Sequence, residues 1–272
     1  ATPPPVLVLC PVAVSPNGRR ATNKPMKRNS TDVLHSVQDP EEAILAEVEA
    51  LFWSGKTREV CRRVDRIDLE SANPSAAAQL GIFHGMSLFQ LGDVHSGNDK
   101  LRQSVVLSGE AQTQLHFSAF LALFSRESQF QSPDESLPAL SRLRQLATGL
   151  GDAVSIGSLH LEVARLEGLR GHCINARRHV EIARHLFNRS ERSALKVMLE
   201  LVDSTLEMFA GNLQRATRSA KAGLEQARQA NLCMPLAGSL TNLGSLMLFT
   251  GSPRAAKECL DRALELCDGL IQ

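Results

Sequence analysis

Aromatic residues are scarce in this chain of 272 residues, which has no tyrosine, one tryptophan and ten phenylalanines. β-Sandwiches and barrels normally use more aromatic and β-branched side chains, so the composition favours an all-helical protein. The sequence lacks an apolar run of about 18 residues, and we therefore expect no transmembrane helix. The formal net charge is only +1, which excludes a general electrostatic attraction to nucleic acids or anionic membranes.

The motifs of several large enzyme classes are missing too. The chain contains no Walker-type phosphate loop, no GxSxG and no HExxH. None of the six cysteines forms a CxxC pair or combines with histidine at zinc spacing. His172, His179 and His185 fall in one helical stretch, but no acid or thiol completes a ligand set. We therefore expect no catalytic residues, no cofactor and no metal, and buried thiols in a reducing cytoplasm.

Residues 1–39 differ from the rest of the chain. They contain six prolines and five basic residues, and only Asp32 and Asp39 oppose these, which leaves a local charge of +3. This composition predicts a disordered, Pro-rich basic arm, with contact to an acidic partner as the functional alternative. The apolar stretch 6–14 lacks the basic start and cleavage site of a signal peptide. Because the sequence begins with Ala1 rather than Met, we expect an excerpt of a longer protein.

Five glycines recur at a nearly constant interval, at Gly55, Gly92, Gly171, Gly211 and Gly251. The last three are 40 residues apart, and the step of 79 from Gly92 to Gly171 is close to two such periods. Each glycine follows a helical stretch rich in leucine or phenylalanine and precedes a second amphipathic stretch. A fixed period of this length indicates a repeat protein, and such proteins usually act as binding surfaces.

The last unit shows the pattern of two helices joined by a tight turn. Its apolar residues recur at helical spacing, first as Leu240, Leu243 and Met247 and then as Ala256, Leu260 and Ala263. Gly251 between them predicts a left-handed helix end, and the following Ser252-Pro253 is typical of a helix start. Two helices joined by so short a turn lie antiparallel.

The run LTNLGSLMLFTGSPRAAKECLDRALEL resembles a tetratricopeptide repeat, a family that places small residues where Gly244, Ala256 and Ala263 fall. Ala176, Val180 and Ala183 follow Gly171 at the offsets that Ala256, Leu260 and Ala263 keep from Gly251. The period of 40 is longer than the usual ~34 residues. In this respect the repeats are similar to those of bacterial regulators of the MalT type.

The resemblance implies an all-α, right-handed solenoid of about six antiparallel helix–turn–helix repeats over residues 40–272. We expect the units at 40–76, 77–109, 110–149, 150–189, 190–229 and 230–272. The third unit has no turn glycine, and Ser132-Pro133-Asp134-Glu135 is predicted to cap its second helix instead. In the fifth unit the core stripe is predicted as Leu199, Val202, Leu206 and Phe209.

In tetratricopeptide arrays the first helix of each unit lines the concave side. By this register we expect the groove to contain Met86, Phe89, Arg165, Thr205, Met208, Ser245 and Phe249. Methionine and phenylalanine there suit an amphipathic helix or an extended peptide, and Arg165 offers a forked donor to a carboxylate. The alternative is that these side chains pack between units. Of the positions that chaperone-binding members use to hold a C-terminal carboxylate, only Asn242 matches.

Two charge features stand out in the central units. Segment 162–196 has eight basic and four acidic side chains, and Arg177, Arg178 and Arg184 could form a patch for an acidic partner, such as a missing effector domain. The alternative is a solvated helix surface. Nucleic acid is not expected, because no aromatic residues are interleaved with the arginines. Glu200, Asp203 and Glu207 share one helix face and are predicted to pair with Arg215, Arg218 and Lys221 of the following helix.

The sequence thus predicts a non-enzymatic, cytoplasmic scaffold that binds a protein or peptide and has no membrane partner. The MalT-type resemblance implies the sensor or interaction module of a bacterial transcriptional regulator or signalling protein. Two alternatives stay open. One is an oligomerisation or intramolecular docking module without an external ligand, and the other is an enzyme with an unrecognised site in the groove.

Overall fold

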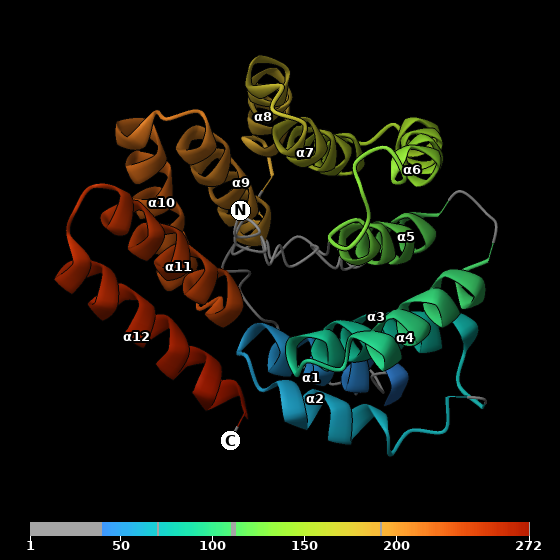
Figure 1. Ribbon diagram of the computed structural model, residues 1–272. Coiled ribbons are helices and arrows are strands. Elements are labelled where there is room, and N and C mark those ends of the chain that lie inside the picture. The colour runs from blue at the N-terminus through green and yellow to red at the C-terminus, as the bar shows by residue number, and fades with distance from the viewer. Residues whose placement is uncertain (1–39, 70, 110–112, 191, 272) are drawn as a thin grey trace, which may run out of the picture.

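The computed structural model describes residues 40–69, 71–109, 113–190 and 192–271, and every regular element in these ranges is an α-helix (Figure 1). The helices are α1 (Pro40–Trp53), α2 (Thr57–Val64), α3 (Pro74–Gln90), α4 (Val94–Leu107), α5 (Gln114–Glu127), α6 (Leu137–Leu150), α7 (Ala153–Leu169), α8 (Cys173–Phe187), α9 (Ser193–Phe209), α10 (Leu213–Gln229), α11 (Cys233–Phe249) and α12 (Pro253–Ile271). They form six consecutive hairpins, as predicted, although α3 begins at Pro74, before the expected start of the second unit at residue 77, and α6 ends at Leu150, one residue beyond the third unit. The predicted arm, residues 1–39, lies outside the described residues. None of the described helices is long and apolar enough to cross a membrane.

The turn glycines have the backbone conformation that their spacing predicts. All five have a left-handed backbone, with φ between 76° and 88°. At Gly211, an added Cβ atom would meet no other atom within 4 Å, so the positive φ rather than lack of space selects glycine. Asn231, with φ of 53°, turns the chain between α10 and α11. Asparagine is among the few other residues that adopt this conformation readily.

Small residues let the two helices of a hairpin approach closely. A Cβ atom on Gly244 of α11 would lie 2.8 Å from Cγ of Leu260 on α12, so any larger residue would force the Leu260 side chain to shift. Ala256 and Ala263 are buried on the facing side of α12. Their predicted counterparts in the fourth hairpin, Ala176, Val180 and Ala183, are fully buried as well. The recurrence of small and apolar residues is therefore a packing pattern, as the tetratricopeptide resemblance implies.

The third hairpin forms its turn without the glycine of the others. The backbone N–H of Ser132 donates to Glu135 at 2.8 Å, and the N–H of Glu135 donates to the Ser132 hydroxyl at 3.3 Å. This reciprocal arrangement is a capping box. Helix α6 begins shortly afterwards, at Leu137. The segment 132–135 therefore forms a capped turn before α6, whereas the N-cap residue of α6 is Ser136, whose side chain makes no capping hydrogen bond.

The six hairpins curve into a ring, with the odd-numbered helices inside and the even-numbered helices outside (Figure 1). The last helix, α12, contacts α2 of the first hairpin. Trp53 at the end of α1 packs both on the core of the first hairpins and on the core that α7 to α11 share. The first hairpin thus meets the last hairpin through α2 and α12, and Trp53 packs it on the core of the later hairpins.

One member of the predicted core stripe of the fifth hairpin is not part of the core. Leu199, Val202 and Leu206 are buried, as expected, whereas the Phe209 side chain is 41% exposed. Phe209 is the last residue of α9, where the neighbouring helices no longer cover the end of the helix. The prediction that Phe209 is a core residue was wrong. Sequence periodicity identifies which face of a helix is apolar, but it does not show how far along the helix neighbouring residues bury that face.

Candidate interaction surface

One apolar side chain lies at or just beyond the C-terminal end of each inner helix from α3 to α11. These residues, here called the apolar ladder, are Phe89, Phe130, Leu169, Phe209 and Phe249, separated by 41, 39, 40 and 40 residues. Phe89 is half-buried, and the other four are 62%, 42%, 41% and 68% exposed in chain order. Equivalent positions of consecutive repeats lie along one edge of an array. The ladder therefore gives one rim of the ring a periodic row of apolar groups.

Neighbouring members of the apolar ladder share contacts in two places. The ring centroids of Phe89 and Phe130 are 6.0 Å apart, and the guanidinium carbon of Arg126 lies 4.7 Å from the centroid of the Phe89 ring. Such a cation–π contact contributes about 0.5–2 kcal/mol. Leu169 and Phe209 line the same small apolar cavity between α7 and α9. The ring contact and the cation–π contact hold Phe89 and Phe130 in defined positions on the rim.

A buried ion pair lies one helical turn before Leu169 on α7. Arg165 Nε donates to Glu162 Oε2 at 3.0 Å, and the Arg165 side chain is only 3% exposed. Arg165 also donates to the Ser128 hydroxyl, and the Ser125 hydroxyl donates to Glu162. Both serines belong to the third hairpin, so these bonds join α5 to α7. The guanidinium group of Arg165, which the sequence analysis expects to bind a partner's carboxylate, therefore forms its hydrogen bonds within the protein.

The bonds between hairpins recur at one sequence separation. Ser125 and Glu162, Ser128 and Arg165, and Thr205 and Asn242 are each 37 residues apart. Asn242 donates to Thr205 Oγ1 at 3.1 Å and to the backbone oxygen of Leu201 at 3.2 Å. Sequence reasoning missed these pairs, although polar residues spaced slightly closer than the repeat period were a signal for them. Asn242 thus joins α11 to α9.

The structure separates the seven predicted groove residues into two groups. Buried are Met86, Arg165, Thr205 and Met208, whereas Phe89 and Ser245 are half-buried and Phe249 is exposed. Met86 belongs to the core of the first hairpins, and Met208 packs against α10 and α11 residues. Only Phe89 and Phe249 belong to the apolar ladder. The role of all seven in partner binding stays a prediction.

Sequence reasoning did not identify three members of the apolar ladder as surface residues. Phe130 and Leu169 were not singled out, and Phe209 was assigned to the core. The signal was present in the sequence, because Leu169, Phe209 and Phe249 each stand two residues before a turn glycine. Trp53 has the same position before Gly55, but it is half-buried where the ring closes.

The alternative basic patch is largely paired with acids of the next inner helix. Arg177 on α8 makes a two-pronged contact with Glu207 on α9, at 2.7 and 2.9 Å. Arg184 donates to Asp203 at 3.0 Å and also pairs with Glu200. Arg178 is exposed. Arg177 and Arg184 therefore bind hairpins four and five together, although their partly exposed guanidinium groups still face the outside.

The predicted pairing between α9 and α10 is confirmed for one residue of three. Arg215 Nε lies 3.2 Å from Glu207 Oε1, whereas Arg218 and Lys221 make no ion pair with any described residue. Burial favours the neutral form of Glu207, but hydrogen bonds from Arg177 and Asn212 overcome this and lower its pKa. An open cleft of ≈ 480 Å³ lies beside this network, lined by residues of α8, α9 and α10. Equal numbers of acids and bases line the cleft, so it has no net charge.

Two half-buried histidines, one from α7 and one from α8, meet within the fourth hairpin. Nδ1 of His160 and Nδ1 of His179 are 2.7 Å apart, so one nitrogen must donate a proton and the other must accept it. Burial lowers the pKa of both residues, and for His160 the second cause is His179 itself. Arg144 lowers both values further, whereas Glu167 partly offsets the shift at His179. The pair therefore favours neutral imidazoles.

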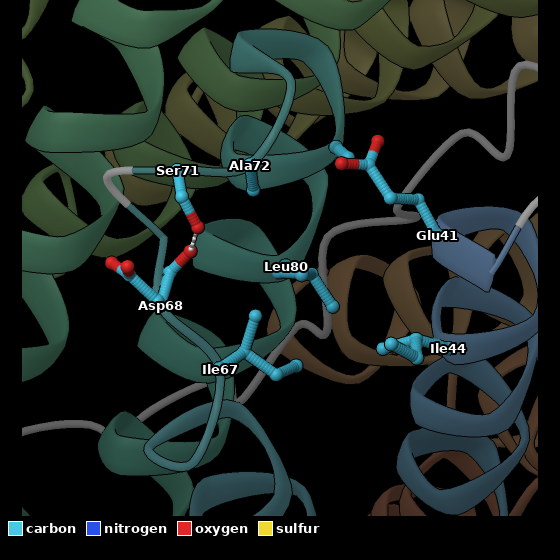
Figure 2. Close-up of a pocket in the computed structure, with 8 residues that line it drawn as sticks. Glu41, Ile44, Ile67, Asp68, Ser71, Ala72 and Leu80 are labelled. Carbon is cyan, nitrogen blue, oxygen red and sulfur yellow. Dashed lines mark hydrogen bonds between the residues drawn. The ribbon is translucent and has the colours of Figure 1, made fainter.

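A small pocket lies between α1, α3 and the segment that joins α2 to α3 (Figure 2). It measures ≈ 170 Å³, and Ile44, Ile67 and Leu80 form much of its lining. Glu41 at its edge accepts a hydrogen bond from the backbone of Asn73 at 3.1 Å. Within the described residues, no group of three or more His, Cys, Asp or Glu side chains could hold a metal ion.

Two solved structures resemble the chain in fold. BtubC (BKLC) from P. vanneervenii is 14% identical, with 85% of this chain and 92% of that chain covered and a TM-score of 0.49. The apo form of RapI is 13% identical, with 86% and 67% covered and a TM-score of 0.51. No protein-family model matches the sequence, and no curated protein is similar enough to count as a relative. The chain is an all-α, tetratricopeptide-like array of paired helices.

Proposed function

We propose that the protein is a non-enzymatic scaffold that binds a segment of another protein along the apolar ladder. The observation that carries this proposal is the exposure of Phe130 and Phe249 in a row that repeats once per hairpin from the second to the sixth. Aromatic and leucine side chains held on a rigid array lose little entropy when a partner covers them. A row of five such groups offers the anchors that a hot-spot interface needs.

The finer parts of the proposal concern context. A tetratricopeptide-like array suits the sensor or interaction module of a bacterial transcriptional regulator or signalling protein, and a reducing cytoplasm suits its free cysteines. The partner is then a protein or peptide, including an effector domain of the same parent protein. The resemblance to MalT-type regulators supports this context, and the ladder supplies a surface through which it could act.

Photo-cross-linking at a ladder position tests the proposal. Benzoylphenylalanine in place of Phe249 keeps an aromatic ring on the rim and should capture a second protein in cells that produce the chain. Benzoylphenylalanine in place of Ile174 is the matched control, because Ile174 is also exposed, at 69%, but lies on the outer helix α8. Capture from both positions alike, or from position 174 alone, would contradict binding along the ladder.

A further inference from the structure

The two helices of the last hairpin, α11 and α12, pack in a fixed antiparallel register. A Cβ atom on Gly244 would lie 3.2 Å from the backbone oxygen of Ala256, which places these two residues opposite each other. Steps of four, three and four residues, backward along α11 and forward along α12, stay on the facing sides of both helices. The pairs reached in this way are Leu240 with Leu260, Ala237 with Ala263, and Cys233 with Cys267. The register therefore brings two cysteines together at the open end of the hairpin.

The same register is visible in the preceding hairpins. Phe187 of α8 stands 80 residues before Cys267, or two periods of the repeat, and its side chain is fully buried. A Cβ atom on Gly157 of α7 would collide with the Phe187 ring, so this ring faces the first helix of its own hairpin. Ala227, one period before Cys267, is fully buried as well. The position of Cys267 in the repeat is thus one that faces the first helix, which in the last hairpin is α11.

The electrostatics of Cys233 indicate that the second thiol is close. Both cysteines are half-buried. Burial raises the pKa of the Cys233 thiol, and Cys267 is the second cause that raises it. Only a nearby group acts in this way, because the energy between two charges falls with their distance. We propose that Cys233 and Cys267 form a reversible redox site, in which a disulfide fastens the open end of α12 to α11.

The oxidant for this site is a disulfide of low molecular weight, such as glutathione disulfide. The thiolate of one cysteine attacks a glutathione sulfur, which breaks the S–S bond and releases the first glutathione. The thiolate of the other cysteine attacks the protein-bound sulfur, forms the bond between Cys233 and Cys267, and releases the second glutathione. The two cysteines lose two protons and two electrons, which convert glutathione disulfide into two glutathione thiols. Because the second step is intramolecular, it favours a neighbouring pair over an isolated thiol.

The disulfide acts on the last hairpin of the array. In a repeat protein each unit is stabilised by its neighbours, so a terminal unit opens more easily than an internal one. Helix α12 packs on α11 and also contacts α2 of the first hairpin. A cross-link at the open end of the hairpin restricts its opening. The inference does not depend on the proposed function, because neither cysteine belongs to the apolar ladder.

Peptide mapping of the full chain tests the site. The protein is incubated with glutathione disulfide, its remaining thiols are blocked with iodoacetamide, and it is digested with trypsin without reduction. Cys233, Cys259 and Cys267 fall in separate tryptic peptides, 229–254, 258–262 and 263–272. We expect peptide 229–254 to be joined to peptide 263–272, and dithiothreitol to separate them. A link of either peptide to 258–262 instead, or glutathione adducts alone at both cysteines, would overturn the proposal.

Two serine variants control for the identity of the pair. Cys259→Ser removes another half-buried cysteine of α12, whose sulfur lies 3.8 Å from that of Met247, and it should leave the yield of the link within about twofold. Cys267→Ser should abolish the link and leave Cys233 as a mixed disulfide with glutathione. Equal loss in both variants would contradict the pairing. Products that join isotopically labelled to unlabelled chains would show a bond between two copies and would contradict it as well.

Hydrogen exchange shows whether the disulfide fastens the hairpin. Backbone amides at the start of α11 and in the second half of α12 should exchange at least about tenfold more slowly in the oxidised protein than in the reduced protein. Amides of α6, which lies in the third hairpin, are the internal reference and should exchange at the same rate in both forms. Equal exchange of the α12 amides in the two forms would overturn the proposed fastening of α12 to α11.

Discussion

Arg165 and Leu169 are one helical turn apart on the same face of α7, yet the structure gives them opposite environments. Arg165 is 3% exposed and bound to the third hairpin, whereas Leu169 is 42% exposed on the rim. The charged residue therefore joins hairpins, and the apolar residue faces outward. This reverses the usual expectation that charge marks the surface and leucine marks the core. The exposed apolar group is thus the better candidate for partner binding.

Removing the Arg165 side chain should have the largest effect on stability. Arg165→Ala leaves Glu162 as a buried charge without its partner, which costs about 3–5 kcal/mol of unfolding free energy. Urea denaturation followed by circular dichroism measures this loss. The double variant Glu162→Gln with Arg165→Met removes both charges and should lose much less. If Arg165→Ala unfolds like the wild type, the ion pair does not hold the third and fourth hairpins together.

The outer network should give a smaller loss at the next interface along the array. Arg184→Ala removes a donor from the buried Asp203, whose carboxylate keeps the Ser219 hydroxyl at 2.7 Å. We expect a loss of about 1.5–3 kcal/mol, the usual contribution of a hydrogen bond to a charged group. Arg178→Ala, on the same helix but exposed, should change stability by less than about 0.5 kcal/mol. Equal losses of stability in Arg184→Ala and Arg178→Ala would show that the removal of a positive charge, and not the loss of the hydrogen bonds to Asp203, destabilises the protein.

A substitution at a turn glycine tests the backbone conformation of the repeat independently of these side-chain interactions. Gly211→Val forces a β-branched residue into a left-handed backbone with φ of 77° and should destabilise the protein by at least about 1 kcal/mol. A new Cβ atom there would contact nothing, so a loss reports the backbone alone. A thermal melt that is unchanged by the substitution would argue against the turn between α9 and α10 described here.

Three histidines predict a modest pH dependence, namely His84, which is buried on α3, and the pair formed by His160 and His179. Burial lowers the pKa of His84, His160 and His179 in the folded protein, so the unfolded chain binds more protons below its own pKa of about 6.5. Stability should be constant above this pH and fall as the pH drops from about 6.5 toward 5. His160→Gln should reduce the slope, as monitored by urea titrations at several pH values. A steeper slope in this variant, or none in the wild type, would contradict the assignment.

The repeat architecture followed from the sequence because it depends on backbone and packing rules that act locally. Gly211 and Gly251 marked the turns, and Ala256 and Ala263 marked the close approach of two helices. The surface was harder to predict, because burial depends on how far neighbouring hairpins extend. Nothing in the sequence near Phe209 shows that α9 ends beyond the cover of its neighbours. The sequence also does not show that Arg165 donates a hydrogen bond to Ser128, which belongs to another hairpin.

The most direct test of the ladder as the binding surface is the yield of the partner cross-link at position 249 in a chain that also carries Leu169→Ser and Phe209→Ser. These two residues are more than one-third exposed, so circular dichroism should stay unchanged. The account predicts at least about a tenfold loss of the cross-linked product, because hot-spot residues lose this much on truncation. Full yield in this chain, together with loss of the product in Arg177→Ala with Arg184→Ala, would place the partner on the outer face and contradict the account.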